Sequence, residues 1–182
     1  SRPISFVVIS IASSSPRIIC GLKGNGNIFI IKAKIEPIAV TSFDINMDSS
    51  LNVSEAVEIY YHPGIAPGFD SQLDHPYTMI FQQNVIGMGK GNVTVLPNLP
   101  SPVFIPANAT YSFYITTVVN NTTTTTSGET NLWYNVGVAV GDIVASDQYV
   151  KIGEGYAVSY PFLNYTKRKR WNGEDACLHI SN

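Results

Sequence analysis

Charged residues are scarce in this sequence of 182 residues, where they make up 13% of the chain, half of the usual ~25%. Lysine and arginine number 11 and aspartate and glutamate 13, so the net charge is −2. A chain with so little positive charge builds no field that would hold nucleic acid phosphates. Nucleic acid is therefore excluded as a partner.

Long apolar runs are also missing, and no stretch of 18 apolar residues exists that could span a membrane. Motifs of hydrolases, zinc proteases and nucleotide-binding loops are absent. The three histidines, His62, His75 and His179, have no catalytic partner that the sequence identifies. We therefore expect that the protein is not an enzyme and that it binds no cofactor.

Cysteine is rare, with Cys20 and Cys177 near opposite ends of the sequence. A disulfide between them would close a loop of about 157 residues, worth roughly 5 kcal/mol in the chain-entropy model. We favour this disulfide over two buried thiols, because the sequons described below indicate an oxidising compartment. No cysteine–histidine cluster exists, and the aspartate pairs 70/74 and 142/147 are interpreted as solvated loop charges, so no metal is expected.

Valine, isoleucine and threonine are abundant, at 17, 20 and 13 residues against only 8 leucines. These β-branched residues pack well on pleated surfaces and lose rotamer freedom in helices. Runs of them alternate with turn signals, and the only helix candidate is a single turn near Asp142–Asp147. The pattern predicts an all-β antiparallel sandwich or jelly roll, with strands at 28–35, 38–47, 55–61, 77–85, 92–96, 109–119, 132–140, 156–160 and 176–180.

Six Asn-x-Ser/Thr triplets stand out. With 15 asparagines and 30 serines and threonines in 182 residues, chance would give roughly 2.5. Such triplets accept N-linked glycans in secreted proteins, and sugar would solubilise a surface poor in charge. We therefore predict a glycoprotein at the cell surface or outside the cell, with sites at Asn52, Asn92, Asn108, Asn120, Asn121 and Asn164. The remaining alternative is that these triplets are accidental.

Three further features have both a functional and a plain interpretation. The tract Thr122, Thr123, Thr124, Thr125 and Thr126 is a candidate for O-linked sugars or an ordinary polar loop. The run at 167–170 (KRKR) could contact an anionic polysaccharide, be cut by a processing protease, or form a surface turn. Aromatic residues could form a sugar-stacking platform or pack ordinarily, namely Tyr60, Tyr61, Tyr77, Trp133, Tyr134, Tyr156, Tyr160, Tyr165 and Trp171.

The segment 4–12 (ISFVVISIA) is apolar on both alternating faces and is followed by SSSP. Its length and flanks suit the core of a signal peptide, but we favour a strand buried on both faces. This divides the chain into an N-terminal strand and linker at 1–15 and a sandwich domain at 16–182.

Seven stretches follow one another along the chain, namely GNGNIFIIKAK, VTSFDINMD, VEIYYHPG, GMGKGNVTVLP, IPANATYSFYITT, GDIVASDQYVKIGEGYAVSYPF and RWNG. In this order they resemble a secreted β-sandwich module of bacterial, algal and oomycete surface proteins, and the resemblance spans residues 21–180. The resemblance implies a sandwich fold and an extracellular setting, without an assigned catalytic activity. This chain departs from the module in its KRKR run, its threonine tract and the apolar segment 4–12.

If the module is already a complete sandwich, segment 4–12 has no obvious place in its own domain. It could complete a neighbouring subunit as a donor strand, with Ile4, Phe6, Val7, Val8, Ile9 and Ile11 as its apolar residues. Head-to-tail donation does not close on itself, so it yields a homopolymer. We expect a structural subunit of an extracellular, glycosylated fibre or coat. The alternatives are a strand that folds into its own sheet and, for function, a secreted carbohydrate-binding module.

Overall fold

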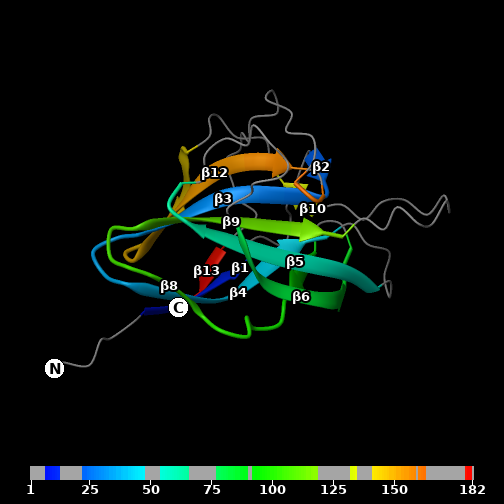
Figure 1. The fold of residues 1–182 in the computed structure, drawn as a ribbon, viewed down its shortest axis with the longest axis horizontal. Helices are drawn as coiled ribbons and strands as arrows, with labels where there is room; N and C mark the ends of the chain where they lie inside the picture. Colours follow the sequence, from blue (N-terminus) through cyan, green and yellow to red (C-terminus); the bar gives the residue numbers. More distant parts are fainter. Residues whose placement is uncertain are drawn as a thin grey trace.

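The structure, a computed structural model, describes residues 7–12, 22–47, 54–65, 77–89, 92–118, 132–134, 141–158, 160–162 and 179–181. All regular elements in these ranges are strands, and none is a helix. Most of the strands form two sheets that lie one above the other (Figure 1). The predicted antiparallel β-sandwich is confirmed.

The larger sheet contains six strands, and all neighbours in it are antiparallel. Their order across the sheet is β11 (Ile143–Ser146), β12 (Val150–Val158), β3 (Gly26–Ala33), β9 (Thr110–Thr117), β5 (Ser54–Pro63) and β6 (Thr78–Ile86). Among the described strands, β11 and β6 are therefore its two edges.

The smaller sheet is built on β4 (Ile38–Asn46), which pairs with three other strands. On one side lies β1 (Val7–Ala12), followed by β13 (His179–Ser181), and on the other lie β7 (Val93–Val95) and β8 (Val103–Ile105). Two short strands, β2 (Leu22–Gly24) and β10 (Leu132–Tyr134), form a separate pair. The pairing of β1 with β4 is parallel, whereas all other strand pairs among the described residues are antiparallel.

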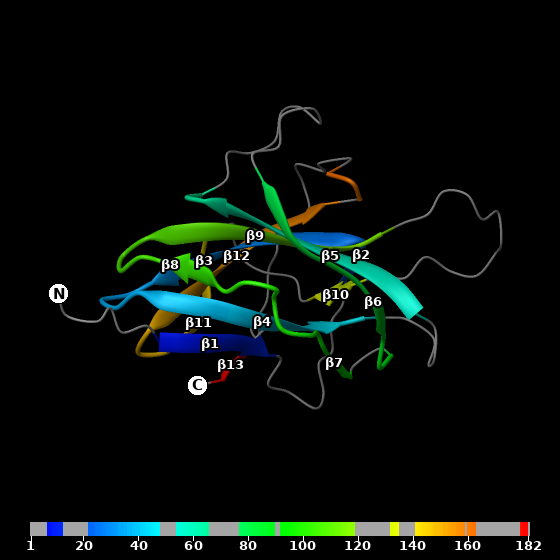
Figure 2. The same ribbon diagram turned by 60° about the horizontal axis from the view of Figure 1, so that its bottom comes forward.

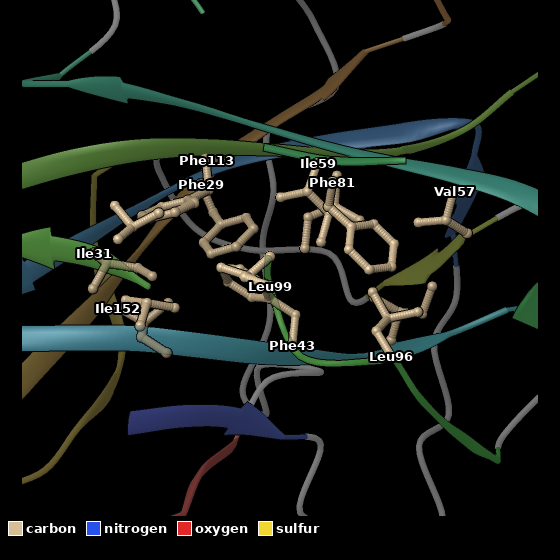
Figure 3. Close-up of a cluster of buried hydrophobic side chains, with 14 of the residues drawn as sticks. Phe29, Ile31, Phe43, Val57, Ile59, Phe81, Leu96, Leu99, Phe113 and Ile152 are labelled. Atoms are coloured by element: carbon tan, nitrogen blue, oxygen red, sulfur yellow. The ribbon is translucent and has the colours of Figure 1, made fainter. Parts of the chain in front are cut away.

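Alternating side chains from both sheets meet in one apolar core. Phe29 on β3 and Phe113 on β9 point down from the larger sheet, and Phe43 on β4 points up to meet them (Figure 3). The ring centroids of Phe43 and Phe113 are 5.3 Å apart, and those of Phe29 and Phe113 are 6.0 Å apart. Such aromatic packing joins the layers, because each buried ring removes a large apolar surface from water.

Two parts of the predicted strand pattern are wrong. The helical turn expected near Asp142–Asp147 is instead strand β11, which pairs with β12. Strand β12 starts at Val150, six residues before the predicted start at Tyr156, because Lys151 and Glu154 obscured the apolar pattern. The short strands β2, β8 and β11 were not predicted, since three or four residues carry too little periodicity.

Candidate functional site

The predicted donor strand includes β1, which lies in the smaller sheet between β4 and β13 (Figure 2). Ile9 is opposite Val40 of β4, and the register shifts by one residue before Ser10, which is opposite Ser42. On the other side, Ser10 is opposite Ser181 of β13. Of the donor-strand residues, Val7, Val8, Ile9 and Ile11 lie in β1, whereas Ile4 and Phe6 lie outside the described residues.

Strand β4 is central to the core that β1 borders. Ile38, Val40 and Phe43 are fully buried, and the core-facing side chains of β4 pack against the larger sheet. On one side of β4, residues 38–43 pair with the backbone of β1. If β1 left this place, the backbone of a central strand would lose its partner, and an unpaired buried backbone group is costly. The site therefore requires a strand with the register of β1.

Two of the six predicted glycosylation sites are in the described part of the chain, and both side chains are exposed. Asn92 precedes β7 and donates a side-chain hydrogen bond to the Met88 carbonyl at 3.0 Å. Asn108 lies between β8 and β9 with a φ of 63°, a left-handed conformation that asparagine tolerates well. The other four sites, the threonine tract, both cysteines and the KRKR run lie outside the described residues.

A cluster of aromatic residues covers the face of the larger sheet that points away from the core. We call this the tyrosine cluster: Tyr60, Tyr77, Tyr114 and Phe162, with Ile28 and Val158 beside them. The ring centroids of Tyr114 and Phe162 are 4.4 Å apart, and those of Tyr60 and Phe162 are 5.2 Å apart. The cluster is a second, smaller core that holds residues 160–162 against the sheet.

A buried carboxylate lies beside this cluster. Glu58 on β5 accepts a hydrogen bond from the Tyr60 hydroxyl at 2.7 Å and another from Nε2 of Gln82 at 2.9 Å. Burial raises the pKa of Tyr60, and the hydrogen bond and charge of Glu58 raise it further. Burial also raises the pKa of Tyr114 to about 12, although Thr116 and the Phe162 backbone act in the opposite direction. These tyrosines are therefore neutral at physiological pH. The cluster packs apolar surface against the sheet, and the Glu58 carboxylate beside it is held by two hydrogen bonds.

The arrangement of the tyrosine cluster does not resemble a sugar-stacking platform. Among the tyrosines proposed for stacking whose side chains are described, Tyr77 is buried, and Tyr60, Tyr61 and Tyr160 are half-buried. Tyr61 stacks on Tyr111 with ring centroids 6.0 Å apart, and it packs against the main core. A sugar stacks on an aromatic face that solvent can reach, whereas the rings of Tyr60, Tyr61 and Tyr77 pack against other aromatic rings of the protein.

The polar residues considered for chemistry are dispersed. His62 on β5 is half-buried beside the ring of Tyr77, His179 lies in β13, and His75 lies outside the described residues. The Asp147 carboxylate accepts hydrogen bonds from the backbone N–H groups of Tyr149 and Val150, so it stabilises the turn between β11 and β12. Within the described ranges, no group of three residues suited to metal binding is found. No helix of that same part is long and apolar enough to cross a membrane.

Two features near the site were not foreseen from the sequence. The first is the buried Glu58 carboxylate, whose only signal is a charged residue between Val57 and Ile59 in a strand. The second is the parallel pairing of β1 with β4, which has no local sequence signal. No family model and no curated protein matches the sequence.

Proposed function

We propose that this chain is a structural subunit of an extracellular, glycosylated fibre or surface coat, in which β1 of one copy inserts into the smaller sheet of the next. The observation that supports this proposal best is the way β1 is held. Among the described strands, β1 pairs only with β4 and β13, and the larger sheet does not pair with it. A second copy could supply the same six residues with the same contacts, as in domain swapping.

Docking of the apolar segment beside β4 is favourable in magnitude, whether in its own chain or in the next copy. About five apolar side chains at roughly 2 kcal/mol each would give on the order of 10 kcal/mol gross per junction. Ordering the donated segment offsets much of this gain, and the backbone pairing with β4 and β13 adds to it. Because the contacts are the same within one chain and between chains, protein concentration and the connecting residues 13–21 decide the balance. Those nine residues can span at most about 30 Å.

The exposure of both described sequon asparagines agrees with a glycosylated surface. Asn92 and Asn108 flank β7 and β8, on the opposite side of β4 from β1. Glycans there would leave the pairing edges of β1 uncovered. The proposed assembly therefore places sugar and strand donation on different parts of the smaller sheet.

The decisive experiment introduces a cysteine pair across the junction. Ser10 and Ser181 are direct partners in an antiparallel pair, where Cα atoms lie at a separation that a disulfide spans. The variant Ser10→Cys with Ser181→Cys, made with Cys20→Ser and Cys177→Ser, is refolded at high concentration and oxidised. Donation predicts a covalent ladder of oligomers on non-reducing gels, because each new disulfide would join two subunits.

Two controls complete this test. The single variants Ser10→Cys and Ser181→Cys, in the same background, should form no ladder, since each cysteine then faces a serine across the junction. If the double variant forms only an intramolecular disulfide and stays monomeric by mass photometry, β1 belongs to its own chain and the fibre proposal fails. A chain lacking residues 1–15 should not polymerise, and a peptide of residues 1–15 should bind it.

A further inference from the structure

Strand β6 is an edge of the larger sheet with β5 on one side, and no other described strand pairs with it (Figure 2). None of its nine residues, TMIFQQNVI, is charged or proline. Edge strands usually carry such residues because an unpaired edge is a template for another strand. The edge β6 lacks this protection.

A bulge gives β6 an unusual arrangement of side chains. Ile59 of β5 is opposite Phe81, but the next residue, Tyr60, is opposite Met79, so Ile80 is one extra residue in β6. A bulge of one residue reverses the alternation beyond it. Met79 therefore lies on the same face as Gln82, Asn84 and Ile86, whose partners on β5 are Glu58, Ala56 and Ser54.

This outward row, Met79–Gln82–Asn84–Ile86, is complementary to itself. When a second copy of β6 is placed antiparallel with Gln83 opposite Gln83, Gln82 is opposite Asn84. If the extra residue Ile80 also stays unpaired on this side, Met79 is opposite Ile86. The two amide side chains can exchange hydrogen bonds. Met79 is 48% exposed and Ile86 is 57% exposed, so each would bury apolar surface on the other. Like charges cannot face each other in this register, because β6 has none.

We propose that β6 is a self-pairing edge through which two copies of this chain join antiparallel about a two-fold axis at Gln83. The larger sheets of the two copies then form one continuous sheet with six strands from each. This interface is isologous, so it closes after two copies. It is independent of the proposed donation of β1, which belongs to the other sheet.

A charge at the two-fold axis tests the proposal in the full chain. Gln83 is exposed, so Gln83→Lys leaves the subunit folded but brings two lysines together in the dimer. Juxtaposed like charges should raise the dissociation constant at least about tenfold, as measured by sedimentation velocity. Gln148→Lys, the same change at an exposed position between β11 and β12, is the control and should leave dimerisation unchanged.

Rescue by the opposite charge separates this interface from any other. Gln83→Glu alone should weaken the dimer like Gln83→Lys, and an equal mixture of the two variants should form a heterodimer again. The proposal is overturned if the wild-type chain sediments as a monomer at high concentration, if Gln83→Lys dimerises as the wild type does, or if the mixture gives no heterodimer. Filaments whose growth persists in Gln83→Lys would show that strand donation proceeds without β6.

Discussion

Gly155 on β12 lies so close to the backbone of Ile28 on β3 that a β-carbon there would overlap the Ile28 carbonyl oxygen. This approach falls where the pairing of the two strands shifts register, between Gly153 and Tyr156. Glycine is required here because of space, since a backbone neighbour cannot rotate away as a side chain can.

We therefore expect Gly155→Ala to lower the free energy of unfolding by about 3 kcal/mol or more, because β12 must shift against β3. Gly153→Ala is a matched comparison, since its β-carbon would meet side-chain atoms of Ile30 at 2.5 Å. A side chain can change rotamer, so this loss should be smaller. Urea unfolding of both variants measures the difference, and equal losses would contradict the backbone clash.

The tyrosine cluster should make stability depend on alkaline pH. The pKa of Tyr114 is about 12 in the folded chain, above the ordinary value of 10.0. A raised pKa means that the folded state holds the proton more tightly than the unfolded state does. The contribution of Tyr114 to the free energy of unfolding is therefore fully present below pH 10 and is lost as the pH rises towards 12.

The variant Tyr114→Phe keeps the ring but removes the titrating hydroxyl. Between pH 9 and 12 it should lose less free energy of unfolding than the wild type, by on the order of 2 kcal/mol. Denaturant unfolding across this pH range measures the effect. Parallel curves for the two proteins would show that Tyr114 does not titrate with folding.

Asp44 on β4 should act as a small destabilising charge at neutral pH. Its side chain is buried, and burial raises the pKa of its carboxyl. The folded state therefore favours the protonated carboxyl. This contribution to the free energy of unfolding is fully present below the pKa of Asp44 in the unfolded chain, and it is lost as the pH rises through its pKa in the folded chain. Asp44→Asn is close in shape but carries no charge.

We expect Asp44→Asn to unfold at a higher denaturant concentration than the wild type at pH 7, and the gap should close as the pH falls below 4. Glu36→Gln, at an exposed position, is the control for loss of one carboxylate. If Asp44→Asn is the less stable protein at pH 7, the carboxylate makes a favourable contact that outweighs its desolvation.

The glycosylation site at Asn108 can be separated from its backbone role. Asn108→Gly and Asn108→Gln both remove the acceptor nitrogen, so both should lose one glycan by intact mass spectrometry of protein secreted from a eukaryotic host. With a φ of 63°, glycine fits and glutamine is strained by about 1 kcal/mol. Only Asn108→Gln should therefore be less stable, and a mass that differs from the wild type only by the substituted residue would show that the site is unused.

Much of the fold could be predicted because it follows from local alternation. In β5, Val57 and Ile59 face the core while Glu58 and Tyr60 lie on the other face, and this period of two is visible in the sequence. The turn at Asp147 also has a local cause, since its side chain caps two backbone N–H groups within three residues. The sequence alone thus determined an all-β chain with its main strands.

Only the tertiary structure decided which strands are neighbours and in what register. The parallel pairing of Ile9 with Val40 joins residues 31 positions apart, and no local pattern encodes it. The bulge at Ile80 that aligns Met79 with Ile86 depends on the fit of β6 to β5. Local periodicity sets which face a side chain takes within a strand, but pairing depends on long-range packing, so the edges available for assembly emerge only when the sheets are formed.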